Sequence, residues 1–496
     1  MTSPDDSVQT SVLGDAARIQ LAPSARVVEV LGTTFGQAGH ELALVGGPVR
    51  DALLGRLAGS SDADLDFTTD ARPEDVLALL EDVAETTWDV GIRFGTIGAR
   101  IAGREVEITT YRAEAYDLES RKPDVDFGST LDADLVRRDF TINAMAIRIP
   151  DFSAGQAPDL ELVDLFGGRA DLDARLIRTP GTPHDSFTDD PLRMMRAARF
   201  SAQLGFEVAP EVVVAMTDQA ERLSIVSAER IREELMKIIM SPAPRRGLTL
   251  LVDTGLAEYV LPELPLLRLE ADEHHHHKDV YEHTLTVLEQ AMVLEDAHEP
   301  VSGPDPVLRL AALLHDIGKP RTRRFEDDGR VSFHHHEVVG ARMTRKRMQA
   351  LRFSNEMTDD VSTLVELHLR FHGYGSGEWT DSAVRRYVRD AGPLLSRLHK
   401  LTRADSTTRN RRRAIALQKS YDSLEARIAE LAEQEELASM RPDLDGRDIM
   451  RILDIPAGPV VGQAYQFLLD LRLDRGPLSS EMAEEALRAW WAARPE

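Results

Sequence analysis

The sequence contains no cysteine among its 496 residues. This absence excludes disulfide bonds, thiolate metal sites and cysteine nucleophiles, so any metal must be held by His and carboxylate side chains. No apolar run is long enough to span a bilayer. The acidic, polar start MTSPDDSVQT lacks the basic and then apolar pattern of a secretion signal. These absences predict a cytoplasmic protein that does not contact a membrane.

Positive charge is also scarce, because 59 Lys and Arg residues face 84 Asp and Glu residues, a net charge of −25. Taken alone, this balance argues against nucleic acid, since phosphate contacts come from Lys and Arg. The segment from Arg385 to Lys419 is an exception, with eleven basic and two acidic residues. It is either a surface for nucleic acid or a solvated basic helix face.

The chain is too long for one domain, and at roughly 150 residues per domain it predicts about three or four. Short β-type runs alternate with helical stretches over residues 41–180, whereas a 3.6-residue period dominates after Asp189. The predicted fold class is α+β, with an N-terminal head of mixed sheet and helices followed by mostly α-helical regions. The predicted parts are a flexible N-terminus, a head, a neck, a second domain and a tail: 1–24, 25–180, 181–268, 269–410 and 411–496.

One short stretch concentrates chemistry-bearing residues. It holds two adjacent glycines, an arginine and two acids one residue apart: Gly46, Gly47, Arg50, Asp64 and Asp66. On a strand the two acids share a face, where they suit Mg²⁺ together with substrate phosphates. The glycine backbone can approach a phosphate closely, and the arginine can bind its charge. Glu107 is a candidate third acid from a neighbouring strand. A lone D-x-D is usually a polar strand face, but the preceding Gly-Gly and Arg favour a phosphoryl transfer site.

These motifs occur in a characteristic order with several others, namely GGPVRDALLG, DADLDFTTD, RFGTI, EITTYRAEAY, RRDFTINAMA, DDPLRMMRAARF and AERIREEL. Together they resemble the class II tRNA nucleotidyltransferases, the CCA-adding enzymes, of the DNA polymerase beta-like superfamily. The resemblance covers roughly residues 40–265. It implies template-independent addition of C, C and A to the 3′ end of tRNA from CTP and ATP, with Mg²⁺ on Asp64 and Asp66.

The resemblance also implies nucleotide contacts at a set of polar residues: Gly46, Gly47, Arg50, Arg138, Asp139, Asn143, Asp190, Arg193 and Arg196. Asp190 and Arg193 would read the incoming base, and their spacing of three places them on one face of a predicted helix. A carboxylate acceptor beside a guanidinium donor suits cytosine and adenine and rejects uracil and guanine. The alternative is an ordinary charge pair on a neck helix. The polar stretch between Tyr111 and Leu131 resembles the flexible loop that CCA-adding enzymes need to switch from C to A.

Spaced His and Asp residues later in the chain resemble the HD metal-dependent phosphohydrolases: His283, His315, Asp316, His336, His368 and Asp405. The resemblance implies one metal on His283, His315, Asp316 and Asp405, with His336 and His368 supporting a second metal or a substrate phosphate. Such ligands suit Mn, Fe, Ni, Mg or Zn, so the metal stays open. A water activated there would attack a phosphoester. The alternative is a vestigial site without metal.

The remaining expectations concern partners and rivals. Four arginines in the basic segment are candidates for tRNA backbone contacts: Arg409, Arg411, Arg412 and Arg413. A bacterial poly(A) polymerase shares the fold and the opening motifs, and an HD phosphohydrolase whose head merely binds nucleotide is a second rival. Neither a protein partner nor the oligomeric state can be predicted from the sequence.

Overall fold

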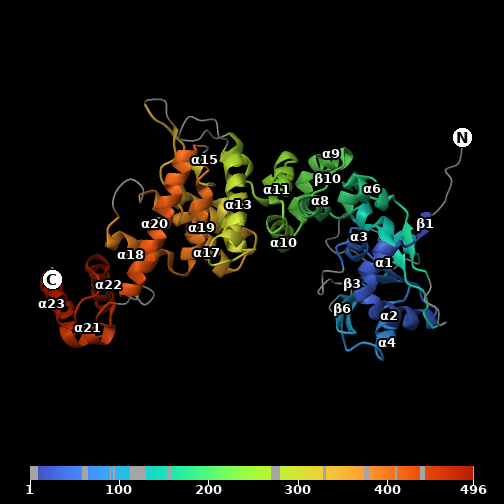
Figure 1. The fold of residues 1–496 in the computed structure, drawn as a ribbon, viewed down its shortest axis with the longest axis horizontal. Helices are drawn as coiled ribbons and strands as arrows, with labels where there is room; N and C mark the ends of the chain where they lie inside the picture. The colour runs from blue at the N-terminus through green and yellow to red at the C-terminus, as the bar shows by residue number, and fades with distance from the viewer. Residues whose placement is uncertain are drawn as a thin grey trace. The chain divides into compact units, whose positions relative to one another are not determined.

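The computed structural model describes residues 9–57, 65–89, 91–92, 95–111, 130–153, 159–269, 280–327, 331–373, 379–407, 410–435 and 442–494. The chain forms two compact units, residues 1–260 and 261–496, which we describe separately (Figure 1). Strands concentrate in the first unit, and the second is almost entirely helical. The predicted α+β class, a head with a mixed sheet followed by helices, is therefore confirmed.

The first unit contains a large sheet, two short strands and many helices. The sheet strands are β1 (Gln9–Val12), β2 (Leu42–Val45), β3 (Leu65–Thr69), β4 (Thr86–Trp88), β5 (Thr96–Ile101), β6 (Arg104–Thr110), β7 (Met145–Arg148) and β8 (Glu161–Asp164). The helices are α1 (Asp15–Leu21), α2 (Ala25–Gln37), α3 (Gly47–Leu53), α4 (Pro73–Leu80), α5 (Leu131–Val136), α6 (Gly168–Ala174), α7 (Pro183–Asp189), α8 (Leu192–Leu204), α9 (Pro210–Asp218), α10 (Ala228–Ile239), α11 (Pro244–Asp253) and α12 (Ala257–Val260). The short strands β9 (Leu176–Ile177) and β10 (Glu207–Val208) pair in parallel.

The second unit is a set of packed helices with one small hairpin. Its helices are α13 (Val280–Ala297), α14 (Pro306–Leu314), α15 (Lys319–Thr322), α16 (His336–Ala350), α17 (Asn355–Leu367), α18 (Asp381–Ala391), α19 (Leu395–Asp405), α20 (Arg411–Glu435), α21 (Gly446–Leu453), α22 (Pro459–Arg475) and α23 (Ser480–Ala492). The hairpin pairs β11 (Arg324–Phe325) with β12 (Val331–Ser332). The helical period did not predict β10 or this hairpin, because two-residue strands are too short to show a period of two.

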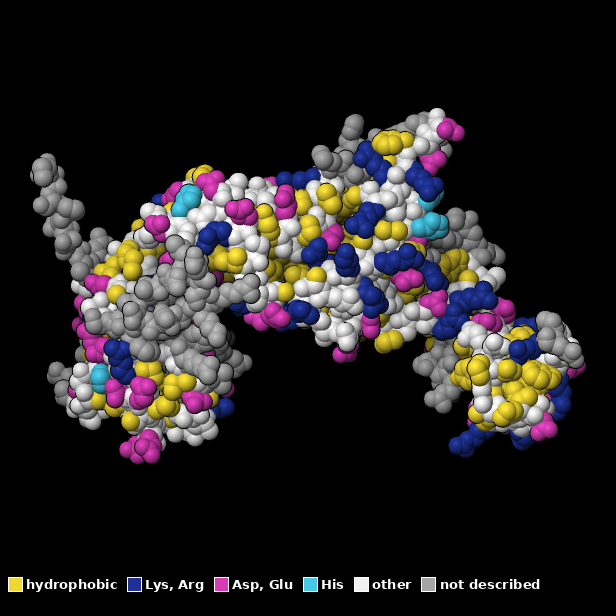
Figure 2. Space-filling view, turned by 180° about the vertical axis from the view of Figure 1, so that it is seen from behind, with side chains coloured by type: hydrophobic (Ala, Val, Ile, Leu, Met, Phe, Trp, Pro, Cys, Tyr) yellow, Lys and Arg dark blue, Asp and Glu magenta, His cyan; other side chains and the backbone are white. Residues whose placement is uncertain are grey.

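The surface carries both signs of charge. Figure 2 shows Lys and Arg side chains interspersed with Asp and Glu side chains over the face it presents. No helix among the described residues is long and apolar enough to cross a membrane.

The sheet order brings strands from distant parts of the sequence together: β1-β8-β7-β2-β3-β6-β5-β4. All neighbouring pairs are antiparallel except β3 and β6, which run parallel with Asp66 beside Glu107. Laterally paired residues face the same side of a sheet, so these two acids share a face. The central strand β2, with sequence LALV, is buried throughout, as expected for a strand covered on both sides.

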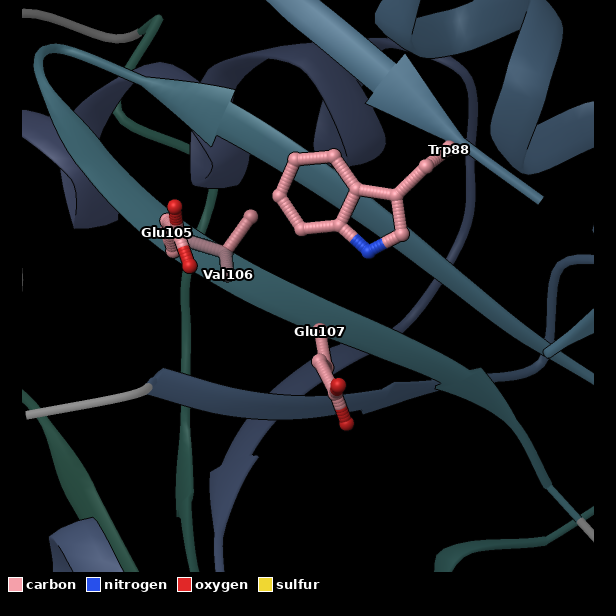
Figure 3. Close-up of a pocket in the computed structure, with 4 residues that line it drawn as sticks. All are labelled: Trp88, Glu105, Val106 and Glu107. Atoms are coloured by element: carbon pink, nitrogen blue, oxygen red, sulfur yellow. The ribbon is translucent and has the colours of Figure 1, made fainter. Parts of the chain in front are cut away.

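A tryptophan of the edge strand β4 packs over the neighbouring strand β5. Trp88 on β4 pairs with Gly98 on β5, where a Cβ atom would lie 1.9 Å from the indole nitrogen, so only glycine fits beneath the ring. The indole and three residues of β6 line a hollow of about 330 Å³ (Figure 3): Glu105, Val106 and Glu107.

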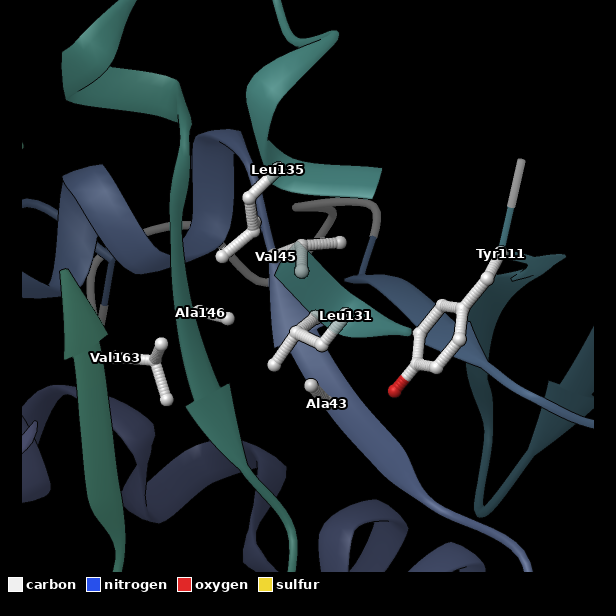
Figure 4. Close-up of a cluster of buried hydrophobic side chains, with 7 residues drawn as sticks. All are labelled: Ala43, Val45, Tyr111, Leu131, Leu135, Ala146 and Val163. Atoms are coloured by element: carbon white, nitrogen blue, oxygen red, sulfur yellow. The ribbon is translucent and has the colours of Figure 1, made fainter. Parts of the chain in front are cut away.

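One part of the head core connects three strands with a helix. Ala43 and Val45 of β2, Ala146 of β7 and Val163 of β8 contact side chains of α5 and Tyr111 (Figure 4). Burying these apolar surfaces holds α5 on the sheet, at roughly 25 cal/mol per Å² removed from water. This packing positions the segment after α5, residues 137–143, beside the ends of β2 and β3.

Candidate functional site

A cavity of about 400 Å³ lies in the first unit, where the β2–α3 turn, β3, residues 137–143 and α8 meet. All nine residues expected to contact nucleotide line it together with Asp66: Gly46, Gly47, Arg50, Asp66, Arg138, Asp139, Asn143, Asp190, Arg193 and Arg196. Four further residues complete the lining: Arg137, Arg199, Phe200 and Gln203. Six arginines thus face three aspartates. The excess of positive charge suits a polyanion such as a triphosphate.

The turn after β2 opens one side of the cavity. Gly46 has a φ of +73°, a backbone conformation that side chains disfavour, and a Cβ atom there would lie 3.2 Å from Arg138 Nη1. Arg50 on α3 donates from Nη1 to Asn143 Oδ1 at 2.8 Å and from Nε to Asp51 Oδ1 at 2.8 Å. The arginine is therefore fixed in position before any ligand arrives.

Asp139 is a buried carboxylate that interacts with three neighbours. Its Oδ1 accepts from Asn143 Nδ2 at 3.0 Å and from the Phe140 backbone N–H at 2.8 Å, and its Oδ2 lies 2.6 Å from Arg196 Nη2. Burial raises the pKa of Asp139, but Arg196 and the Asn143 hydrogen bond outweigh it and hold the pKa below its ordinary value. Asp139 is thus an anion that organises Arg196 and Asn143 around the cavity.

The prediction that Asp190 and Arg193 lie on one helix is wrong. Asp190 lies in extended backbone between α7 and α8, and α8 begins at Leu192. The break arises at Pro191, which lacks a backbone N–H and disfavours helical backbone in the residue before it. Asp190 Oδ1 accepts from the Leu192 N–H at 3.1 Å. Its Oδ2 accepts from Arg230 of α10 at 2.9 Å. The cavity nonetheless brings Asp190 and Arg193 together.

Arg193 is held by groups that the sequence did not indicate. Its Nη1 donates to Ser186 Oγ at 2.9 Å, and its Nη2 donates to the carbonyl oxygen of Arg137. Asp190 is therefore fixed by Arg230, and Arg193 by Ser186 and a backbone carbonyl.

The acids of the sheet are only partly described. Asp66 lines the cavity, and its Oδ2 lies 3.6 Å from the position that a Cβ on Gly46 would take. Asp64 lies outside the described residues. Glu107 is exposed in the hollow beside Trp88 and does not line the cavity, although it neighbours Asp66 across the strands. A carboxylate facing a polyanion site fits Mg²⁺, which takes one or two carboxylates and completes its shell with phosphates and water.

Sequence reasoning missed Arg199, Phe200 and Gln203, although a signal existed. They follow Arg193 and Arg196 at spacings of three and four, which place them on the same face of α8. The ring of Phe200 contacts two guanidiniums, since the guanidinium carbon of Arg199 lies 4.2 Å and that of Arg50 5.3 Å from its centroid. Arg199 also pairs with Glu234 of α10 at 2.8 Å. Arg137 carried no comparable pattern.

The second unit gathers all six predicted HD residues. They lie at or near the ends of helices α14, α16, α17 and α19 and within α13, and form two adjacent groups that could hold metal: His283, His315 and Asp405, and Asp316, His336 and His368. Asp316 faces both groups, because its Oδ2 lies 3.2 Å from His315 Nε2 and its Oδ1 lies 3.3 Å from His336 Nε2. His283 Nε2 lies 3.0 Å from Asp405 Oδ1. The expected partition placed Asp316 only with His283, His315 and Asp405, whereas its two oxygens face both groups.

Three of the imidazoles are oriented in the same way. The Nδ1 atoms of His315, His336 and His368 lie 2.8, 2.8 and 2.6 Å from backbone carbonyl oxygens three residues earlier. A carbonyl only accepts, so each Nδ1 carries the proton and each Nε2 presents its lone pair to the cluster when the ring is neutral. This is the arrangement that fixes the tautomer of a histidine ligand.

The cluster also requires a positive charge. Burial lowers the pKa of His315, but Asp316 and Asp405 outweigh burial and raise it to about 10. Burial, and then repulsion from His315, lowers the pKa of His368 to about 3. Burial opposes ionisation of Asp316, yet His315 and Lys319 hold its pKa well below the usual range.

The donor set fits divalent ions. A bound cation would replace the proton on His315, because metal ligands must be deprotonated. Ligands about 2.0–2.2 Å from one ion in perpendicular directions are about 3 Å apart, which matches the separations of the donor atoms.

The basic segment is not one surface. Lys400 and Arg403 are buried, and Arg403 pairs with Asp422 and Glu425. Two further arginines pair with acids distant in sequence: Arg386 with Asp474 and Arg397 with Asp305. The segment as a whole is therefore neither a single nucleic-acid surface nor a single solvated face, because tertiary contacts neutralise or bury several of its charges.

The proposed tRNA contacts remain open to solvent where the structure describes them. Arg411, Arg412 and Arg413 are exposed at the start of α20. Arg409 and the 112–129 part of the candidate C-to-A loop lie outside the described residues.

Comparisons with known proteins agree with this geometry. The Poly A polymerase head domain matches residues 42–178, the probable RNA and SrmB-binding site of polymerase A matches residues 205–267, and the HD domain matches residues 280–435. The cavity lies across the first match and the helices that follow it. The His and Asp cluster lies within the third.

Two related proteins differ in how much of the chain they match. An A-adding tRNA nucleotidyltransferase of Deinococcus radiodurans is 32% identical over 457 residues, 91% of this chain and 95% of that protein. A CCA-adding enzyme of Levilactobacillus brevis is 43% identical over 227 residues, 46% of this chain. The chain spans about half the length of the CCA-adding relatives, 53% in this case.

A solved structure shows the same fold over nearly the whole chain. The Bacillus stearothermophilus CCA-adding enzyme in complex with CTP has a TM-score of 0.66 at 24% identity, and the match covers 95% of this chain and 98% of that one.

Proposed function

Since the chain belongs to the tRNA nucleotidyltransferase family, we propose that it adds C, C and A to the 3′ end of tRNA from CTP and ATP. The tRNA 3′-hydroxyl would attack the α-phosphate of the nucleotide, and pyrophosphate would leave. The observation that carries the proposal is the cavity of the first unit, which collects all nine expected nucleotide contacts and Asp66 in about 400 Å³.

The side chains divide this work by their chemistry. Arg50, Arg138 and the arginines of α8 would neutralise the triphosphate, bidentate phosphate binding being typical of guanidinium groups. Asp190 and Arg193 would accept cytosine or adenine, because a mismatched base leaves buried polar groups unpaired. Asp66 with Asp64 would hold Mg²⁺, which when bound lowers the pKa of the attacking hydroxyl and stabilises the leaving pyrophosphate.

A second candidate is addition of the final A alone. The observation that favours it is that the relative matching 91% of the chain is an A-adding enzyme, whereas the CCA-adding relatives match about half. We prefer CCA addition because the identity to the CCA-adding enzyme, 43%, is higher than the identity to the A-adding enzyme, 32%.

One assay distinguishes these activities. Purified protein is incubated with labelled CTP, ATP or both, on tRNA that lacks the whole 3′ CCA and on tRNA that ends in CC. CCA addition predicts two C residues on the first tRNA with CTP alone, and one A on the second with ATP alone. Incorporation only of A on the second tRNA would establish A addition instead. Long A tracts would indicate a poly(A) polymerase and contradict both readings.

We infer that the HD domain binds divalent metal and hydrolyses phosphoesters. The two adjacent groups of ligands carry this proposal, since Asp316 of one group lies 3.2 Å from His315 of the other and two adjacent ions can stabilise both the attacking and the leaving oxygen. Bound ions would supply Lewis acidity, while the oriented imidazoles hold the ions in place. The test is elemental analysis after chelation and reloading with Mn, Fe, Ni, Mg or Zn, followed by hydrolysis of bis(p-nitrophenyl) phosphate. A chain that retains no metal and hydrolyses nothing would contradict it.

A further inference from the structure

The β11–β12 hairpin lies between two of the candidate metal ligands. It follows Asp316 and α15, and it ends just before His336. Ser332, at the base of the hairpin, is four residues before His336. At 3.3–3.6 Å per residue, the two residues are therefore at most about 14 Å apart. In Figure 1 the hairpin projects beyond the helices near α15.

The residue that follows the hairpin contacts the cluster. Phe333 is buried, its carbonyl oxygen lies 2.8 Å from His336 Nδ1, and its ring centroid lies 5.6 Å from Lys319 Nζ. Lys319 Nζ in turn lies 2.9 Å from Asp316 Oδ2. The β12 end of the hairpin is therefore anchored beside the HD site.

The hairpin exposes an aromatic ring to solvent. Phe325 is 71% exposed, the highest value among the large hydrophobic side chains exposed on the described part of the chain. The guanidinium carbon of Arg323 lies 4.8 Å from the ring centroid, and Arg321 and Arg324 are exposed nearby in sequence. The acid Glu326 is engaged by Ser332 and by His334 at 3.8 Å. Figure 2 shows hydrophobic, basic, acidic and His side chains together on this projecting segment.

We propose that the β11–β12 hairpin is a nucleobase-stacking platform that holds a single-stranded oligonucleotide for the HD site, with Phe325 as the stacking residue. Single exposed hydrophobic side chains are common and need no function. Phe325 differs because its ring, the adjacent guanidiniums and the candidate HD metal cluster occur in one short segment of the chain. Proteins bind single-stranded nucleic acids through aromatic rings interleaved with cationic side chains. The inference rests on the HD activity proposed above, and it names the substrate class.

The first test reads stacking locally and needs neither metal nor catalysis. A Phe325→Trp variant of the full chain is titrated with hexaadenylate in the presence of EDTA, and indole emission is compared with that of the unsubstituted chain, which has four Trp. Stacking predicts additional quenching in the variant. An abasic oligomer of equal charge should not produce it. Equal quenching by the abasic oligomer, or no more quenching in the variant than in the unsubstituted chain, would overturn the proposal.

The second test separates the platform from the hydrolase. Phe325→Ala should raise the KM for a single-stranded oligonucleotide about 5- to 100-fold and leave hydrolysis of bis(p-nitrophenyl) phosphate unchanged, since that substrate has no nucleobase. Phe325→Trp should restore the KM. The matched control is Val293→Ala, which truncates another exposed side chain of the same unit, 67% exposed. This variant should leave the KM for both substrates unchanged. An unchanged KM in Phe325→Ala would contradict the proposal that the hairpin binds nucleobases. If the unsubstituted chain hydrolyses neither substrate, the proposed HD hydrolase function is contradicted, and the binding test above still decides the hairpin's role.

Discussion

At the residue scale, Phe200 is the clearest case of a side chain that supports the cavity by holding its arginines. Its ring contacts the guanidiniums of Arg50 and Arg199 and meets Phe140 edge-on, with ring centroids 5.8 Å apart. The ring is apolar and buried, so its residue type alone gives no sign of a role in the cavity. The structure shows that it contacts two cations that line the cavity.

Replacing Phe200 with Leu should therefore weaken nucleotide binding. Each cation–π contact contributes about 0.5–2 kcal/mol, so we expect the KM for CTP to rise about 3- to 30-fold with a smaller change in kcat. Steady-state kinetics measures this, with Phe200→Tyr as the control that keeps the ring. An unchanged KM in a folded Phe200→Leu variant would show that the ring has only a packing role.

A second prediction at this scale concerns base discrimination. Arg230 holds Asp190 Oδ2, and the pair is partly exposed. Arg230→Gln should free the carboxylate to rotate and lower the preference for CTP over UTP about 2- to 5-fold, the range expected for an exposed ion pair. Competition between the two nucleotides measures it. Arg246→Gln, which breaks a similar pair with Glu207 in the same unit, should leave the preference unchanged.

At the element scale, helix ends supply residues to both candidate sites, beside the face of α8 that lines the cavity. The break between α7 and α8 presents Asp190, and the ends of helices α14, α17 and α19 present His315, His368 and Asp405. The HD helices are held by a buried ion pair, in which Arg309 of α14 lies 2.7 Å from Glu295 of α13. Both side chains are nearly inaccessible to solvent.

Breaking that pair should destabilise the second unit. Arg309→Met leaves Glu295 buried and without its cation, which typically costs about 3–5 kcal/mol. Chemical denaturation followed by circular dichroism measures the loss. Arg26→Met removes an exposed pair with Glu29 and should change stability by less than about 1 kcal/mol. Equal effects of the two substitutions would contradict the argument.

At the scale of the whole molecule, the two candidate sites share no residue and lie in different compact units. Asp66→Ala should abolish CMP incorporation and spare hydrolysis, and Asp316→Ala should do the reverse. The double variant should show the sum of the two losses, as expected for sites that share no residue. Loss of both activities in either single variant would show that the sites are coupled.

The exposed arginines of α20 allow a further prediction. Replacing Arg411, Arg412 and Arg413 with Glu should weaken tRNA binding and reduce the slope of log K against log salt by about 2, from roughly 0.7 per lost phosphate contact. Binding titrations at several salt concentrations measure the slope. The thermal midpoint should not change, because all three side chains are exposed. An unchanged slope would remove α20 from the tRNA surface.

The sequence by itself determined the chemistry and the fold class. Residue types such as Asp66, Arg50 and the spaced His and Asp residues can be recognised without coordinates, because metal and phosphate binding require those groups whatever the fold. The alternation of short strands with helices, and the helical period after Asp189, likewise predicted the α+β head and the helical remainder. These are local properties of the chain.

The tertiary structure alone decided which of these groups meet and which are neutralised. It placed Phe200 against two arginines, Asp316 within reach of both groups of ligands, and Asp190 in a break rather than on a helix. It also turned most of the basic segment into buried or paired charges such as Lys400 and Arg403. Sequence spacing reports neighbours along one element, whereas pairing and burial depend on long-range contacts between elements, and these form only when the chain folds.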